Sequence, residues 1–121
     1  MYYTFRQNNS GGIWDINEDV NVFVIIEANS VEDANYRAES DGIYFDGCLN
    51  DIDCGCCGDR WSRTEKYYSR SCIFDSLMDE VAGSKYGVIL YLSIGKLIFS
   101  NIDEINFNKD ILYDYNLGKL I

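Results

Sequence analysis

The chain has 121 residues, with ten lysines and arginines against twenty aspartates and glutamates, so its formal net charge is −10. This length allows one domain with one modest core, and this charge excludes general binding to long nucleic acid or to an anionic membrane surface. Because there is no histidine, the usual general base and the most common metal ligand at neutral pH are both missing.

The location of the protein follows from two further patterns. No apolar run approaches the roughly 18 to 20 residues that a membrane span needs, and the first six residues do not resemble a signal peptide. Five cysteines, three of them within residues 54–57, suit reduced thiols better than a disulfide framework. We therefore expect a cytoplasmic protein with no membrane partner.

The first quarter of the chain predicts strands. Residues 2–6 are β-prone and partly alternating, and residues 7–12 form a polar, glycine-rich turn. Residues 13–16 are expected to return as a strand beside the first. The clearest strand is residues 20–27, which are rich in β-branched side chains.

A capped helix is predicted over residues 31–41. Ser30 is a good N-cap, and Asp33 stands three residues later, as in a capping box. Gly42 stands where the C-terminal cap belongs. A strand is expected over residues 42–45.

The second half predicts a loop, further strands and a second short helix. Near the end of the chain, residues 102–107 alternate between apolar and polar positions, and residues 111–115 form the final segment. The other segments, in order, are a loop over 46–59, a strand over 61–68, a helix over 74–82 ending at Gly83, and a hairpin of strands 86–92 and 96–99. The pattern as a whole predicts an α+β fold, with an antiparallel β-sheet and one or two short helices in a single domain over residues 1–121.

The cysteine-rich loop is the most unusual feature of the sequence. Cys54-Gly-Cys-Cys57 followed by Gly58 resembles a zinc knuckle, in which backbone N–H groups point at thiolates. A structural zinc needs further ligands, which Cys48 and Cys72 would supply only if the fold brings them close. The alternative is that these small side chains simply hold a tight turn. We expect no cofactor and leave zinc as an open alternative.

A short basic segment follows this loop. Residues 15–59 contain twelve carboxylates and one base, whereas Arg60 and Arg63 flank Trp61 directly afterwards. An aromatic ring beside guanidinium groups is suited to a nucleotide, because the ring can stack on a base and arginine can bind phosphate oxygens. The alternative is a core Trp61 with Arg60 in an ion pair with Asp53 or Asp59.

The glycine-rich turn offers a second set of polar groups. Asn8, Asn9 and Ser10 precede two glycines, so their amide and hydroxyl groups are candidates to contact a ribose or a phosphate. A plain hairpin turn is the alternative. Nothing in the sequence favours catalysis, because no pairing of a nucleophile with histidine is possible, and we do not expect an enzyme.

Three segments resemble the phage Thoeris anti-defence sponge family. They are YTFRQNNSGG at residues 3–12, IIEANSVEDANYRAE at 25–39 and DCGCCGDRW at 53–61. The resemblance implies an α+β protein that forms dimers or higher homo-oligomers in the host cell cytoplasm. It further implies binding and sequestration, without degradation, of the cyclic ADP-ribose isomer that a bacterial immune TIR enzyme produces.

With that ligand in mind, Arg60 and Arg63 would hold the pyrophosphate, and Trp61 or a nearby tyrosine would stack on adenine. Asn8, Asn9 and Ser10 would contact the ribose, and the resemblance suggests Asn101 as a further ribose or base contact. A different function remains open: an acidic phage inhibitor that occupies the nucleic-acid site of a host protein. A zinc-knuckle module is the third possibility.

Overall fold

The computed structural model describes residues 1–65, 69–77, 81 and 84–107. Within this part of the chain, five strands form one sheet in the order β3-β1-β2-β4-β5. The strands are β1 (Tyr2–Arg6), β2 (Phe23–Glu27), β3 (Ser69–Arg70), β4 (Val88–Leu92) and β5 (Gly95–Phe99). Three of the four pairings are antiparallel, but β2 and β4 are parallel. The α+β class is confirmed, and the expected antiparallel sheet is corrected to a mixed one.

The helices are α1 (Val31–Ser40), α2 (Ile73–Ser76) and α3 (Ile102–Phe107), and a 3-10 turn, η1, spans Ser10–Gly12. The caps of α1 form as the sequence predicts. Ser30 Oγ accepts a hydrogen bond from the Asp33 backbone N–H at 3.0 Å. Asp33 in turn accepts from the Asn29 backbone N–H at 3.1 Å. At the other end, Gly42 has a φ of +107°, which glycine adopts without steric cost.

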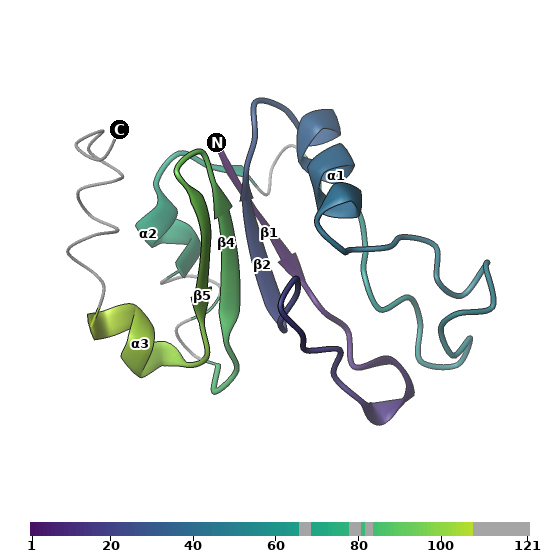
Figure 1. Cartoon of the computed structure of the whole chain (residues 1–121). Coiled ribbons are helices and arrows are strands. Elements are labelled where there is room, and N and C mark those ends of the chain that lie inside the picture. Colours follow the sequence, from purple (N-terminus) through teal and green to yellow (C-terminus); the bar gives the residue numbers. More distant parts are fainter. Residues whose placement is uncertain (66–68, 78–80, 82–83, 108–121) are drawn as a thin grey trace.

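Helices cover both faces of the sheet (Figure 1). The α1 side buries Val24 with Ala34 and Ala38, and the side of α2 and α3 buries Ile25 with Leu77. This division follows from the strand period of two, because successive β2 side chains point to opposite faces and both faces are apolar. The small side chains of the two alanines let α1 lie close to β2.

Two expected strands in the first half are absent. Residues 13–16 do not return beside β1, because β1 pairs with β2 in the register Tyr2↔Glu27 to Arg6↔Phe23. Residues 42–45 form no strand either. Ile43 and Phe45 are buried on the α1 face of the sheet, so the chain leaves α1 across that face and not along an edge.

The expectations for the second half are met in part. The hairpin forms as β4 and β5, with Leu92↔Gly95 as the last pair. Of the strand expected over 61–68, residues 61–65 form no strand and residues 66–68 lie outside the described part; β3 follows and pairs with β1. The helix expected over 74–82 begins at Ile73, but residues 78–80 and 82–83 lie outside the described part, as does the segment 111–115. None of the described helices is long and apolar enough to cross a membrane.

Candidate ligand-binding cleft and cysteine loop

The Arg60 side chain lies inside the protein and joins three segments. It is only 13% exposed. Its Nη1 donates to Gln7 Oε1 and to the Ile13 carbonyl, each at 2.7 Å. Its Nε lies 3.2 Å from the Tyr44 hydroxyl and 3.9 Å from the Asp53 carboxylate. Of the two sequence-based interpretations, the structure shows the internal ion pair with Asp53, so this guanidinium is not presented to a ligand.

Trp61 belongs to the core on the α1 side of the sheet, in a cluster with Phe5 and Ala34. It is 1% exposed. The expectation that it stacks on adenine is therefore corrected, because a buried indole has no free ring face. Its N–H has no hydrogen-bond partner within the described part.

Arg63 stays at the surface but is occupied by a carboxylate. Its Nη1 and Nη2 bind the two oxygens of Asp46 at 3.1 and 2.8 Å, and its guanidinium carbon lies 4.8 Å from the centre of the Phe45 ring. The hydrogen bonds from Arg63 lower the pKa of Asp46 below its ordinary value. Arg60 points toward Gln7, whereas Arg63 points toward Asp46, so the two arginines do not converge on one site.

The asparagines of the N-terminal turn differ in their roles. The Asn8 side-chain amide donates to the carbonyls of Cys57 and Asp59 at 2.8 and 3.2 Å, so it ties this turn to the cysteine loop. Asn9 is exposed, and its carbonyl accepts from the Gly12 N–H at 3.2 Å. Ser10 begins η1, but its side chain lies outside the described part.

Asn101 begins α3. Its Oδ1 accepts from the Glu104 N–H at 3.0 Å, and the Glu104 carboxylate accepts from the Ser100 N–H at 2.6 Å. Asn101 is thus the N-cap of α3, and this local signal makes a helix of residues whose alternation is typical of a strand. Between β5, which precedes Asn101, and β1, which precedes Asn8, lie β2 and β4. Three strand spacings of about 4.8 Å separate the two residues by roughly 14 Å, so Asn101 does not join the others.

A cleft of about 380 Å³ opens where the parallel strands β2 and β4 end. Three elements form its wall: the segment after β2, the C-terminal half of α1, and the β4–β5 hairpin. The lining includes Glu27, Asn29, Arg37, Asp41, Tyr91 and Lys96. None of the ligand-binding residues predicted from the sequence lies in it.

Hydrogen bonds hold the walls of this cleft together. The Tyr91 hydroxyl donates to the carbonyl groups of Asp19 and Asp41, so β4 is tied to the end of α1. Lys96 Nζ donates to the Glu18 carbonyl at 2.7 Å and lies 3.6 Å from the Asp19 carboxylate. The cleft is therefore shaped before any ligand enters.

The charges of the cleft are mixed. The Arg37 side chain is 52% exposed and pairs with Asp33 at 3.0 Å, and the Lys96 side chain is 34% exposed. Burial raises the pKa of Asp41, against the opposing effects of Arg37 and Lys96. Two cations from separate elements thus face one hollow in a protein of net charge −10.

A second hollow, of about 590 Å³, lies at the other end of α1. Glu32 and Glu65 line it, together with Tyr3 and Thr64. Its described lining contains no lysine or arginine, and its one cation, the Met1 ammonium group, faces two glutamates, so it is less suited to an anion than the first cleft.

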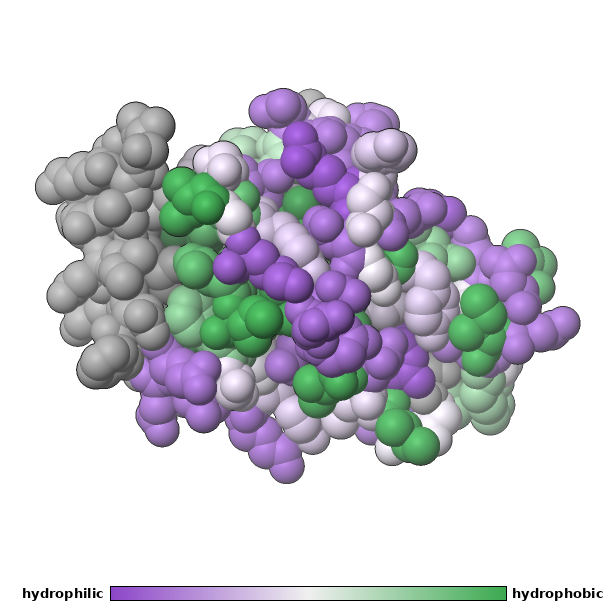
Figure 2. All heavy atoms as spheres, viewed as in Figure 1, coloured by the Kyte–Doolittle hydropathy of each residue, from purple (hydrophilic) through white to green (hydrophobic). Residues whose placement is uncertain are grey.

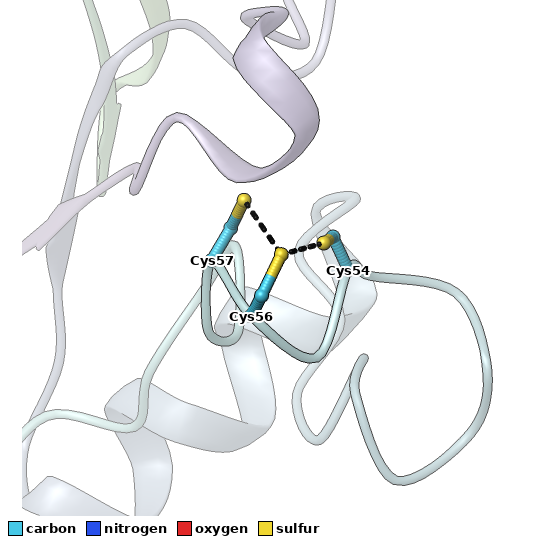
Figure 3. A group of neighbouring side chains, drawn as sticks. All are labelled: Cys54, Cys56 and Cys57. Carbon is cyan, nitrogen blue, oxygen red and sulfur yellow. Dashed lines mark hydrogen bonds between the residues drawn. The ribbon is translucent and has the colours of Figure 1, made fainter.

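The cysteine loop brings three sulfur atoms together on the surface (Figure 3). The Sγ atoms of Cys54, Cys56 and Cys57 all lie within 4.8 Å of one another. Cys54 and Cys56 are 2.7 Å apart, and Cys56 and Cys57 are 3.8 Å apart. Cys48 lies beside them, with its Sγ 3.4 Å from the Cys54 carbonyl oxygen. Cys72 lies outside the loop, just before α2.

Hydrogen bonds within the loop separate the pKa values of two of these thiols. Interactions with the Cys56 thiol and then the Cys56 backbone, followed by those with Cys57, lower the pKa of Cys54 to about 7. The same side-chain hydrogen bond raises the pKa of Cys56 to about 11.

Sequence reasoning missed the residues that matter most around these features. The sequence predicts that Gln7 lies in a polar turn, but its side chain is buried and forms hydrogen bonds with Arg60 and with the backbone of Asp15. Arg37 is the single base between residues 15 and 59. The sequence carries no signal that it lies near Lys96, because this proximity depends on the parallel pairing of β2 with β4.

The comparison with known proteins gives one result. Residues 1–97 match the model of a protein family described as a domain of unknown function, DUF7296, and this range includes the cleft, the cysteine loop and nearly the whole sheet. No curated protein and no solved structure matches the chain. Because the match covers well over half of the residues, the chain belongs to the DUF7296 family.

Proposed function

We propose that this protein binds and sequesters a small phosphorylated nucleotide of the cyclic ADP-ribose type, without degrading it, in the cleft at the ends of β2 and β4. The observation that carries the proposal is the convergence of Arg37 and Lys96 on this cleft. The likeness of three segments to the Thoeris anti-defence sponges supports the class of ligand. In that role the protein would act in the cytoplasm of a phage-infected host cell.

The position of the cleft supports a binding site. In sheets with parallel strands, ligands bind in the crevice at the carboxyl ends of the strands. The volume of about 380 Å³ falls within the range of about 300–1,000 Å³ that is usual for small-molecule sites. Glu27 is the last residue of β2 and Ser93 follows β4, and the Ser93 N–H donates to the Glu27 carboxylate at 2.8 Å, which ties the two strand ends together at the base of the cleft.

The cations would bind the phosphates by exchanging partners. Arg37 now pairs with Asp33 and Lys96 with Asp19, and both cationic side chains are partly exposed. Exposed pairs of this kind contribute little stability, so a phosphate can replace the carboxylates at small cost. Tyr91 offers an aromatic ring in the same wall. Its hydroxyl is bound to backbone carbonyls, which fixes the ring for contact with a base.

Sequestration fits the chemistry of the cleft better than turnover. The chain has no histidine, and of the two carboxylates in the lining Glu27 already accepts a backbone N–H. A binding protein needs no general base.

We further propose that the protein acts as a homo-oligomer, because apolar side chains are exposed at the edge strand of the described sheet. β5 is the last strand of the described sheet, and apolar side chains gather over it in Figure 2. Ile94 and Ile98 are 44% and 50% exposed. Light scattering coupled to size exclusion would test this part, and a monomer at micromolar concentration would contradict it.

Calorimetric titration with cyclic ADP-ribose isomers tests the function and its site together. We expect saturable binding, recovery of intact ligand after heat denaturation, and a loss of affinity of about tenfold for Arg37→Ala or Lys96→Ala. That loss corresponds to roughly 1.4 kcal/mol, the low end for hydrogen bonds to charged groups. Arg63→Ala is the matched control, because this arginine is equally exposed and equally paired but lies outside the cleft.

Three results would change the proposal. Steady consumption of the ligand would contradict sequestration. Binding that Arg63→Ala abolishes and Arg37→Ala leaves intact would retain the function and reject this cleft. Absence of binding to every isomer would reject the function, and salt-sensitive binding to a basic host protein would then favour the acidic inhibitor.

A further inference from the structure

The cysteine loop has a shape that its own backbone maintains. The N–H groups of Cys57 and Gly58 both donate to the Cys54 carbonyl at 3.1 Å. Gly58 has a φ of +88°, which glycine adopts readily. The loop is also anchored from outside, because the Cys48 N–H donates to Asp59 at 2.9 Å and the Asn8 amide donates to the Cys57 carbonyl.

This arrangement matches the turn that holds thiolates around a metal. The Sγ atoms of Cys54, Cys56 and Cys57 all lie within 4.8 Å of one another, so one ion between them can contact all three. The three sulfur atoms lie next to one another, as Figure 3 shows, and all three cysteines are exposed.

We propose that Cys54, Cys56 and Cys57 bind one Zn²⁺ ion, with Cys48 as the fourth ligand. Zinc accepts four thiolates in a tetrahedron with Zn–S distances of about 2.3 Å, which places neighbouring sulfur atoms about 3.8 Å apart. The separation of 3.8 Å between Cys56 and Cys57 already meets this value. The 2.7 Å between Cys54 and Cys56 must widen by about 1 Å, which these exposed side chains can do by rotation.

The fourth ligand has to come from nearby. Cys48 lies outside the group of three whose sulfur atoms are all within 4.8 Å, but its thiol already touches the backbone of Cys54 at 3.4 Å. Cys72 belongs to the segment between β3 and α2 and is not part of this loop. Soft thiolate ligands exclude Mg²⁺ and Ca²⁺, which prefer oxygen.

Cobalt titration tests the site directly. The reduced full-length protein, freed of metal by a chelator, is titrated with Co²⁺ and then with Zn²⁺ as competitor. We expect one equivalent of Co²⁺, a thiolate-to-cobalt charge-transfer band and the visible bands of a tetrahedral ion, all abolished by one equivalent of Zn²⁺. The Cys56→Ser and Cys57→Ser variants should bind more than about 100-fold more weakly, which exceeds the usual effect of losing a supporting residue. Cys48→Ser should weaken binding, and Cys72→Ser should match the wild type.

A second measurement avoids variants altogether. Mass spectrometry after alkylation should show that Zn²⁺ protects the loop cysteines of the wild-type protein, while Cys72 reacts equally with and without metal. Lack of saturable metal binding, equal binding by Cys56→Ser and wild type, or alkylation unaffected by Zn²⁺ would each overturn the proposal. A disulfide between Cys54 and Cys56 that persists in millimolar reductant would overturn it as well.

Discussion

Removal of the Arg60 guanidinium tests how the N-terminal turn, with Gln7 and Ile13, and the cysteine loop, with Asp53, are held together. The substitution Arg60→Met keeps most of the apolar stem but deletes the charge. The Asp53 side chain, 2% exposed, would lose the cation it pairs with, although it would still accept from the Tyr44 hydroxyl at 2.6 Å and from the residue 60 backbone N–H at 2.8 Å. Gln7 Oε1 would keep the Asp15 N–H at 2.6 Å.

The expected loss of folding free energy follows from the interactions that Asp53 loses and keeps. Breaking a buried ion pair by removing one partner costs about 3–5 kcal/mol. The two hydrogen bonds that Asp53 retains place Arg60→Met at the low end, about 3 kcal/mol. With an unfolding entropy of about 2.1 cal/mol/K per residue, this loss lowers the Tm of a 121-residue domain by roughly 12 °C.

The assay is thermal and urea unfolding followed by far-ultraviolet circular dichroism, with two companion variants. Arg60→Met combined with Asp53→Asn should recover about 1 kcal/mol or more relative to the sum of the single changes, because no unpaired buried charge remains. Arg63→Met is the control. It also loses an arginine–carboxylate pair, but an exposed one, and we expect no measurable change in Tm. Equal destabilisation by Arg60→Met and Arg63→Met would refute the distinction between the buried and the surface arginine.

Three further predictions concern single positions. Gly47→Ala should destabilise the fold by about 1–3 kcal/mol, because a Cβ at this position would overlap the Asp53 carboxylate. Gly55→Ala is the control and should not destabilise the fold, because no atom lies within 4 Å of its added Cβ. Urea unfolding compares the two variants. Asp41→Asn should stabilise the protein at pH 7. Burial raises the pKa of Asp41 in the folded state, so the neutral form favours folding below the unfolded pKa near 3.8, and this stability is lost as the pH rises through the folded pKa. The asparagine is neutral at every pH and avoids this loss. The Tm difference between this variant and the wild type should therefore disappear at acidic pH. Ser30→Ala should cost about 1 kcal/mol through the lost N-cap of α1, measurable by the same melts, and Ser30→Gly should cost less.

The sequence predicted those elements whose signals are local. The N-cap at Ser30 and the glycine at position 42 bound α1 to within one residue. The hairpin of β4 and β5 follows from two β-prone runs around Gly95, whose φ is +125°. β1 matches residues 2–6 as predicted, because its alternation and its turn lie in adjacent residues.

Predictions that depended on distant partners were the ones that failed. The return strand over 13–16 had an adequate composition, but β2 offers β1 a fully buried partner, and Ile13 remains 72% exposed. The nucleotide-like grouping of Arg60 with Trp61 was a correct observation of composition. Both side chains nevertheless lie in the interior of the protein. Trp61 packs in the core, and Arg60 pairs with Asp53.

Local sequence thus determined the class of fold, the best-defined helix and strands, and the unusual character of the cysteine loop. Only the tertiary structure decided that β2 and β4 run parallel, which places Arg37 and Lys96 at one cleft although 59 positions separate them. The physical reason is that capping and turn formation depend on neighbours in the chain. Strand order, the burial of a particular tryptophan and the partner of an arginine are settled by which distant surfaces bury the most apolar area together.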